Sequence, residues 1–236
     1  MIRAALDRGA DVTDVYFGYV DAHAFPELVR AVAEADIPIH TLKEGVLEKL
    51  GTTRTPQPVL AVAEWEPRAP ADLVGAASDS FLVVTIDVAD PGNLGTILRS
   101  AEAAGAAGVI VAGTGVDVRS PKVVRASAGA LFGVPVAEAP DVAAVLDLAQ
   151  AADIHCLGAV ARGGADPAQV ALSRGCAVVV GNEAHGISSA VAGRLDGTVT
   201  IPMAGAAESL NVAMAATILC FEAARQRGAP MGEAGR

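Results

Sequence analysis

The feature that most constrains the fold is a series of short apolar runs, each of strand length, separated by stretches of helical character. The clearest run is Phe81–Ile86. Similar runs occupy residues 109–112, 154–159, 177–180 and 198–201, and helical patterns occupy 94–104, 122–130, 142–152 and 209–225. Runs with no polar side are typical of parallel strands that helices cover on both faces. The alternation predicts an α/β fold with a mostly parallel sheet and helices on both faces.

The first part of the chain predicts a separate, smaller unit. Strands are expected at 12–17, 37–41 and 59–62, and helices at 24–35 and 43–50. A polar stretch that contains Pro67 and Pro70 follows, which is typical of a connection between domains. We therefore predict a small αβ domain over 1–66, a linker over 67–80, a second domain over 81–227 and a flexible tail over 228–236.

Charge and aromatic content restrict how the chain can bind nucleic acid. It carries 17 basic and 27 acidic residues, a net charge of −10, and only 3% aromatic residues. An acidic chain attracts polyanions poorly, so any nucleic acid has to be bound by a local basic patch. The scarcity of aromatic residues argues against a surface that binds mainly by stacking on bases.

The cysteines and histidines give no sign of a disulfide framework or a metal site. Cys156, Cys176 and Cys220 are far apart, and the histidines lack ligand spacing, so no metal is expected. No apolar run approaches the roughly 20 residues that cross a bilayer, so no membrane contact is expected. The start of the chain lacks the pattern of a secretory signal. These features predict a cytoplasmic protein.

One glycine-rich loop partly matches a nucleotide-binding motif. Gly113-Thr114-Gly115 begins like a dinucleotide fingerprint, but Val118 stands where that motif has its third glycine. The loop is therefore interpreted as a simple turn. The sequence also lacks the Gly-Lys-Ser/Thr of a phosphate-binding loop and the Gly-x-Ser-x-Gly of a hydrolase nucleophile.

Polar residues follow the predicted strands in two segments, at the edge where ligands bind in open α/β sheets. Asn93 and Arg99 lie in the segment 90–101. Gly181 and Glu183 lie in the segment 178–187, where a glycine allows a ligand to approach the backbone closely. Taken singly, the first segment can be a helix cap with a surface arginine, and the second can be an ordinary strand-to-helix turn.

A third polar segment, 201–213, precedes the most apolar helix of the chain. Ser209 is expected to cap that helix. Asn211 falls in an otherwise apolar first turn, where an asparagine needs a hydrogen-bond partner.

Taken together, the three segments have a specific order. Asn-x-Gly-x-x-x-Arg, Gly-x-Glu-x-x-Gly and Ile-Pro-Met followed by Ser-Leu-Asn resemble the three motifs of the SpoU family, the TrmH-like branch of the SPOUT RNA methyltransferases. The resemblance covers residues 81–227. The first domain resembles the small, ribosomal-protein-like substrate-binding domain of the family, and residues 52–62 are similar to the stretch that ends it. The chain begins inside what resembles the first helix of that domain, so either it starts late or an earlier strand has been lost.

The resemblance implies transfer of a methyl group from S-adenosylmethionine to a ribose 2′-hydroxyl in RNA. It also implies a C-terminal trefoil knot and a homodimer packed through the knotted region. By motif, Gly181, Ile201 and Leu210 are expected to contact the methyl donor, with Ala159, Asn182 and Met203 as weaker candidates. No metal is required, because the sulfonium already activates the methyl group.

The resemblance also assigns the reacting side of the site. Arg99 is expected beside the target ribose and phosphate, where it orients a phosphate that can receive the proton of the 2′-hydroxyl. Arginine itself is effectively always protonated and is a poor base. The residues expected to hold Arg99 and the ribose in place are Asn93, Glu183, Ser209 and Asn211.

Two surfaces are predicted for partners. The last helix is apolar nearly all round, which favours a subunit interface over a central core helix. Arg119, Lys122 and Arg125 are spaced three apart on a predicted helix and can share a face. They are the candidates for an RNA-binding surface, with Arg54 from the first domain, and an ordinary solvated surface is the alternative.

Ribosomal RNA is the favoured substrate, because the first domain resembles that of the ribosomal-RNA members of the family. Three alternatives remain open. They are a transfer-RNA 2′-O-methyltransferase, a non-catalytic RNA-binding paralogue, and an unrelated nucleotide-binding α/β enzyme.

Overall fold

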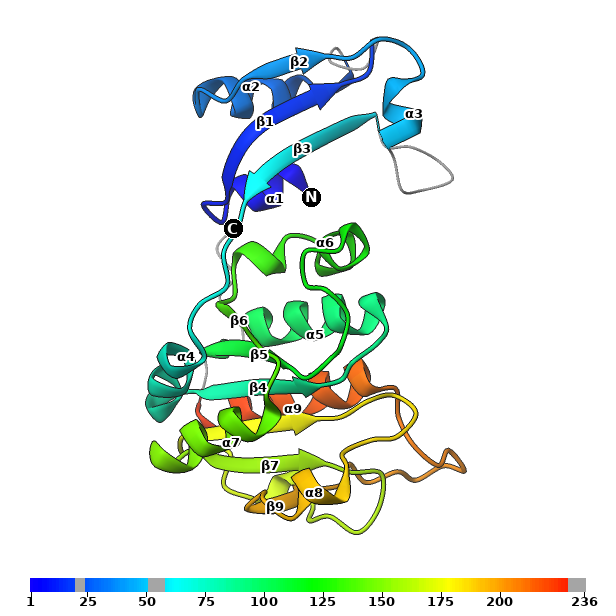
Figure 1. Ribbon diagram of the computed structural model, residues 1–236. Helices are drawn as coiled ribbons and strands as arrows, with labels where there is room; N and C mark the ends of the chain where they lie inside the picture. Colours follow the sequence, from blue (N-terminus) through cyan, green and yellow to red (C-terminus); the bar gives the residue numbers. More distant parts are fainter. Residues whose placement is uncertain (20–23, 51–57, 229–236) are drawn as a thin grey trace. The chain divides into compact units, whose positions relative to one another are not determined.

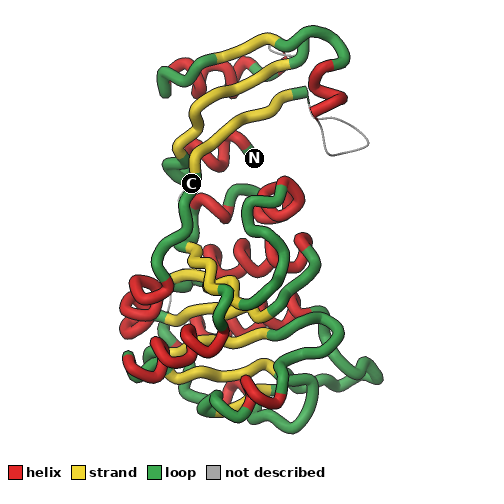
Figure 2. Tube along the Cα trace, in the orientation of Figure 1, coloured by secondary structure: helices red, strands yellow, loops and turns green. Residues whose placement is uncertain are grey.

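A computed structural model of the chain describes residues 1–19, 24–50 and 58–228. The chain divides into two units, Met1–Glu66 and Pro67–Arg236, each with its own sheet (Figures 1 and 2).

The first unit is a three-stranded sheet with helices. Its elements are α1 (Ile2–Leu6), β1 (Asp11–Phe17), α2 (Pro26–Glu34), β2 (Ile39–Thr41), α3 (Val46–Leu50) and β3 (Val59–Glu64). The strand order is β2-β1-β3, with β1 parallel to β2 and antiparallel to β3. Val12, Val15 and Phe17 of β1 pack with Val32 of α2 in the core. Pro26 begins α2, where its missing N–H costs no hydrogen bond.

The second unit contains a six-stranded sheet. Its strands are β4 (Phe81–Ile86), β5 (Gly108–Ala112), β6 (Val136–Ala139), β7 (His155–Ala159), β8 (Cys176–Val180) and β9 (Gly197–Val199). They are ordered β6-β5-β4-β8-β7-β9, and all the pairings are parallel, which confirms the predicted parallel α/β sheet. The strand order reverses direction between β4 and β8, where ligands bind in folds of this class.

Helices cover both faces of this sheet, which explains why every residue of β4 and β8 is buried. Figure 1 shows α4 and α7 on one face and α5 and α9 on the other. The helices are α4 (Pro70–Ala76), α5 (Pro91–Ala103), α6 (Pro121–Ser127), α7 (Val142–Ala151), α8 (Ser189–Ala192) and α9 (Val212–Gln226). Short 3-10 turns lie at η2 (Ala77–Asp79), η3 (Ala130–Phe132) and η4 (Pro167–Gln169).

The prediction of a linker over 67–80 is wrong for most of its length. Residues 70–76 form α4, and Leu73, Val74 and Ala77 lie in the core of the second unit with Val145 of α7. Prolines are typical of linkers, but Pro70 occupies the first position of a helix, which is also a favourable place for proline. The edge strand β6 was not predicted, because it is short and includes Glu138.

The last helix buries one face only. Leu219 and Cys220 are fully buried against the sheet side, whereas Met214, Ile218 and Phe221 are 59%, 42% and 43% exposed. In the single chain, α9 is therefore not the fully enclosed helix that its composition suggests. None of the helices in the described ranges has both the length and the apolarity needed to span a membrane.

Candidate active site

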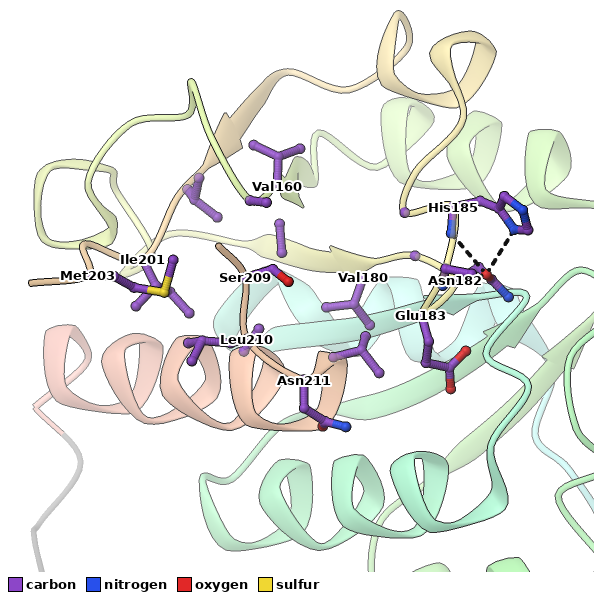
Figure 3. Close-up of a pocket in the computed structure, with 18 residues that line it drawn as sticks. Val160, Val180, Asn182, Glu183, His185, Ile201, Met203, Ser209, Leu210 and Asn211 are labelled. Carbon is purple, nitrogen blue, oxygen red and sulfur yellow. Dashed lines mark hydrogen bonds between the residues drawn. The ribbon is translucent and has the colours of Figure 1, made fainter. Parts of the chain in front are cut away.

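A cavity of about 600 Å³ opens at the carboxyl edge of the second sheet (Figure 3). It is formed by the loops that follow β7, β8 and β9 and by the start of α9. The residues that the family resemblance assigns to the methyl donor all line it: Ala159, Gly181, Asn182, Ile201, Met203 and Leu210. Segments far apart in the chain meet here because the carboxyl ends of parallel strands share one edge.

The cavity has an apolar side and a polar side. Val160, Ile201, Met203 and Leu210 supply apolar surface, and Ser209 lies among them in Figure 3. Such a lining, apolar with a few placed polar groups, is typical of sites for small organic ligands.

A chain of side-chain hydrogen bonds borders the polar side. Asn93 Nδ2 donates to Glu183 Oε1 at 2.8 Å, and Asn211 Nδ2 donates to Asn93 Oδ1 at 2.9 Å. An ionised carboxylate only accepts, so Asn93 has to present its NH2 group to Glu183 and its oxygen to Asn211. The hydrogen bonds thus fix the orientation of both amides and join three motif segments.

Glu183 is held as a carboxylate. Burial by itself raises the pKa of Glu183, but hydrogen bonds from Asn93 and from the N–H groups of Ala89 and Asp90 outweigh it and lower the pKa below its ordinary value. Because the ionised form is favoured in the folded chain, Glu183 contributes stability above the ordinary carboxyl pKa and loses it as pH falls through the lowered value.

Asn211, rather than Ser209, is the N-cap of α9. Its Oδ1 accepts hydrogen bonds from the N–H groups of Ala213 (2.9 Å) and Met214 (3.3 Å). The prediction that Ser209 caps this helix is wrong, because α9 begins at Val212. Ser209 instead lines the cavity.

Gly181, which directly follows β8, allows the next loop to pack closely against it. A Cβ at Gly181 would lie 2.3 Å from the carbonyl carbon of Gly186, so only glycine allows this close approach of backbone to backbone. Asn182 and Gly186 exchange backbone hydrogen bonds of 3.1 and 2.8 Å, which close the loop. The position that a side chain at Gly181 would occupy is thus filled by Gly186, and Gly181 itself borders the cavity.

Arg99 is not among the residues that line the cavity. It lies on α5, exposed, and about 9 Å further along the helix than Asn93 at the standard rise per residue. Six residues correspond to about 600° of rotation, so the two residues lie on different faces of α5. No hydrogen bond or ion pair joins the Arg99 side chain to the part of the chain that the structure describes.

The predicted basic face is divided. Lys122 and Arg125 lie on α6, but Arg119 precedes that helix, so the prediction that all three share a helical face is wrong. Arg119 donates to Glu138 at 2.9 Å and also lies 3.6 Å from Asp117. Arg54 lies outside the described residues.

Several residues of the cavity were not predicted. Val160 and Ala161 follow directly after β7, and His185 lies in the loop after β8 with its Nδ1 3.2 Å from Asn182 Oδ1. The rule that ligands bind beyond the carboxyl ends of strands was sufficient to mark Val160 and Ala161.

The cysteines Cys156, Cys176 and Cys220 are all buried. The described ranges contain no cluster of three or more His, Cys, Asp or Glu side chains arranged to hold a metal. Burial raises the pKa of the Cys156 thiol to about 11 and that of Cys220 to about 12, so both stay protonated and unreactive at neutral pH.

Comparison with known proteins matches this architecture. A protein from Streptomyces viridochromogenes, the 23S rRNA (uridine(2479)-2'-O)-methyltransferase, is 39% identical over 85% of this chain and 71% of its own length. The Bacillus subtilis 23S rRNA (guanosine(2553)-2'-O)-methyltransferase RlmP is 32% identical over 80% of this chain and 73% of its own length.

A solved structure agrees with these relatives. The SpoU methyltransferase AviRb of Streptomyces viridochromogenes, crystallised in complex with AdoMet, superimposes with a TM-score of 0.81 at 34% identity and covers 96% of this chain and 87% of its own. The pattern of the SpoU rRNA Methylase family matches residues 80–221, which contain the motif segments that surround the cavity. The chain therefore belongs to the SpoU rRNA methylase family.

Proposed function

We propose that the protein is an S-adenosylmethionine-dependent methyltransferase that modifies a ribose 2′-hydroxyl in ribosomal RNA. The observation that carries the proposal is the cavity at the carboxyl edge of the sheet, which distant motif segments line together. The relatives named as 23S rRNA 2′-O-methyltransferases and the AdoMet complex of AviRb support the reaction and the cofactor.

The residues of the cavity suit S-adenosylmethionine. The cavity volume of about 600 Å³ lies within the range of pockets that enclose ligands of the size of S-adenosylmethionine. We assign Gly181, Ile201 and Leu210 to hold the donor, with Ala159, Asn182 and Met203 beside them. When bound, the donor supplies a methyl group that its sulfonium has already activated.

The protein's own contribution is to position the acceptor. A ribose hydroxyl reacts when it loses its proton, so a nearby group has to accept that proton. We assign the exposed guanidinium of Arg99 to orient an RNA phosphate that receives it. Ser209 and the hydrogen-bonded chain of Asn93, Glu183 and Asn211 keep the ribose and donor sides of the site in a single geometry.

We further propose a homodimer that packs through α9, together with the C-terminal trefoil knot that the family resemblance implies. Met214, Ile218 and Phe221 follow one another at helical spacing and form an exposed apolar stripe, referred to below as the α9 stripe. An exposed stripe of large apolar side chains is typical of an interaction surface.

Lys122 and Arg125 of α6 are assigned to RNA contact in the second unit. Arg54 is assigned to RNA contact from the sequence alone. The first unit is assigned to substrate binding. The buried, unpaired cysteines fit a reducing compartment, which supports the cytoplasm as the location.

The test of the proposed function is the variant Arg99→Ala, with Arg174→Ala as the matched control. Arg174 is an exposed arginine that shortly precedes the amino end of β8, at the opposite edge of the sheet. Methyl transfer from tritium-labelled S-adenosylmethionine to ribosomal RNA fragments is measured together with donor binding by calorimetry. Arg99→Ala is expected to abolish transfer and to bind the donor as the wild type does, whereas Arg174→Ala keeps both.

The alternative functions give different results. If the protein is a non-catalytic paralogue, the wild type transfers no methyl groups. If it is a transfer-RNA enzyme, the wild type methylates transfer RNA alone. A wild type that binds nicotinamide cofactors in place of S-adenosylmethionine refutes the methyltransferase assignment.

A further inference from the structure

A residue with a strained backbone lies between β4 and α5, the helix that carries Asn93. Asp87 follows β4 and has a φ of 53°, in the left-handed region that residues other than glycine seldom adopt. A backbone of this kind is energetically unfavourable and persists where the surroundings hold it. Because Asp87 lies between β4 and the motif residue Asn93, the contacts that hold its backbone also affect the site.

The side chain of Asp87 holds the glycine-rich loop after β5. Its Oδ1 accepts hydrogen bonds from the N–H of Thr114 at 2.7 Å and from Thr114 Oγ1 at 3.2 Å. A Cβ at Gly113 would lie 2.2 Å from that same carboxylate oxygen, and a Cβ at Gly115 would lie 2.6 Å from the carbonyl oxygen of Val88. Gly113 and Gly115, which begin a dinucleotide fingerprint without completing it, are therefore required for the loop to wrap around residues 87 and 88.

The backbone of Asp87 holds the donor side of the site. Its carbonyl oxygen accepts a hydrogen bond from Asn182 Nδ2 at 2.8 Å. Asn182 Oδ1 in turn accepts from the N–H groups of Ala184 (2.9 Å) and His185 (3.1 Å), which orders the loop that lines the cavity. Both ends of the Asn182 side chain are thus committed, and one of them depends on the orientation of the Asp87 peptide.

The same segment holds the acceptor side. The N–H groups of Ala89 and Asp90 donate to Glu183 at 3.1 and 3.0 Å, and Glu183 is hydrogen-bonded to Asn93. A change in the backbone at Asp87 therefore displaces the carbonyl oxygen that Asn182 binds and the Ala89 and Asp90 amides that bind Glu183.

We propose that Asp87 is a positioning residue for methyl transfer, which acts by anchoring the strained turn after β4 to the Gly113–Gly115 loop. The anchored turn presents a carbonyl oxygen to Asn182 and two amides to Glu183, so that the donor pocket and the acceptor residues keep one relative placement. The proposal rests on the proposed function, because the placement matters only if both sides of the site react together.

The test compares Asp87→Gly, Asp87→Asn and Asp153→Gly in the full chain. Asp87→Gly permits the same backbone and removes the anchor, whereas Asp87→Asn tolerates the left-handed conformation and keeps an oxygen that can accept from Thr114. Asp153 is the matched control, because it also has a left-handed backbone (φ 57°) but shortly precedes β7, away from the cavity.

Three readouts are taken below the melting temperature of every variant. They are the dissociation constant of S-adenosylmethionine, the kcat and KM for methyl transfer, and amide hydrogen exchange of residues 182–187 without ligand. Asp87→Gly is expected to bind the donor about tenfold more weakly, to lower kcat, and to exchange faster at 182–187, which is the scale of one lost link in a hydrogen-bond network. Asp87→Asn and Asp153→Gly are expected to stay within about threefold of the wild type.

Two outcomes separate the proposals. If the wild type binds the donor and transfers methyl groups while Asp87→Gly matches Asp153→Gly in every readout except melting temperature, Asp87 is structural and the positioning role is refuted alone. If the wild type neither binds the donor nor transfers methyl groups, the proposed function is refuted, and the positioning role falls with it.

Discussion

At the scale of single residues, Asn211 has two tasks that its two side-chain atoms divide between them. Oδ1 caps α9 by accepting from Ala213 and Met214, and Nδ2 donates to Asn93. A cap of this kind stabilises a protein by about 1 kcal/mol, so the loss of Asn211 affects folding as well as chemistry. The sequence alone predicted only the chemical part, since it placed the cap at Ser209.

A serine at position 211 separates the cap of α9 from the hydrogen bond to Asn93. Asn211→Ser keeps a capping oxygen but is too short to reach Asn93, so methyl transfer is expected to fall at least about tenfold with little change in melting temperature. Asn211→Ala loses both functions and is expected to lower the free energy of unfolding by about 1 kcal/mol as well. Thermal melts and the tritium assay measure the two effects. Full activity in Asn211→Ser would remove the Asn93 contact from the mechanism.

At the scale of elements, the motif glycine Gly95 is a packing residue. A Cβ at Gly95 would lie 2.3 Å from Ala126 Cβ and 2.8 Å from the backbone nitrogen of Ser127, so α5 and α6 touch through backbone at this point. The close approach sets the position of α5, which carries Asn93 and Arg99. The Asn-x-Gly-x-x-x-Arg pattern therefore combines site residues with one residue that places their helix.

Replacement of this glycine by alanine has a matched control within the same unit. Gly95→Ala is expected to destabilise the protein by about 1–3 kcal/mol, because overpacking outweighs the better helix propensity of alanine. A Cβ at Gly75 in α4 would meet no atom within 4 Å, so Gly75→Ala is expected to stabilise by up to about 1 kcal/mol. Urea titrations give both values. Equal effects of the two substitutions would contradict the packing role of Gly95.

At the scale of the whole molecule, the α9 stripe predicts the state of assembly. Burial of Met214, Ile218 and Phe221 in a dimer removes apolar surface from water, and a charge placed within the stripe opposes that burial. Ile218→Asp is expected to convert a dimer to single chains in light scattering coupled to gel filtration. Val62→Asp is the control, because Val62 is also exposed (45%) but lies on β3 of the first unit. A wild type with the mass of one chain would refute the dimer.

The apolar runs and the motif order carried much of the prediction. A strand covered on both faces has to be apolar along its length, so β4 and β8 were recognisable from local sequence. Elements without such a pattern were missed or misread. The edge strand β6 contains a glutamate, and α4 begins with a proline that resembles a linker signal.

The sequence by itself determined most of the strands and helices of the second unit and which polar residues stand at the strand ends, because burial on both faces imposes a local pattern on such elements. Only the tertiary structure decided how those residues pair. Asn93 and Asn211 are 118 positions apart, and Asp87 and Asn182 are 95 apart, yet each pair is joined by one hydrogen bond. Such contacts depend on the order of strands in the sheet and on the exact start of α9, which no local pattern records. The same holds for Arg119, which precedes the N-cap of α6 and donates a hydrogen bond to Glu138 on the edge strand β6.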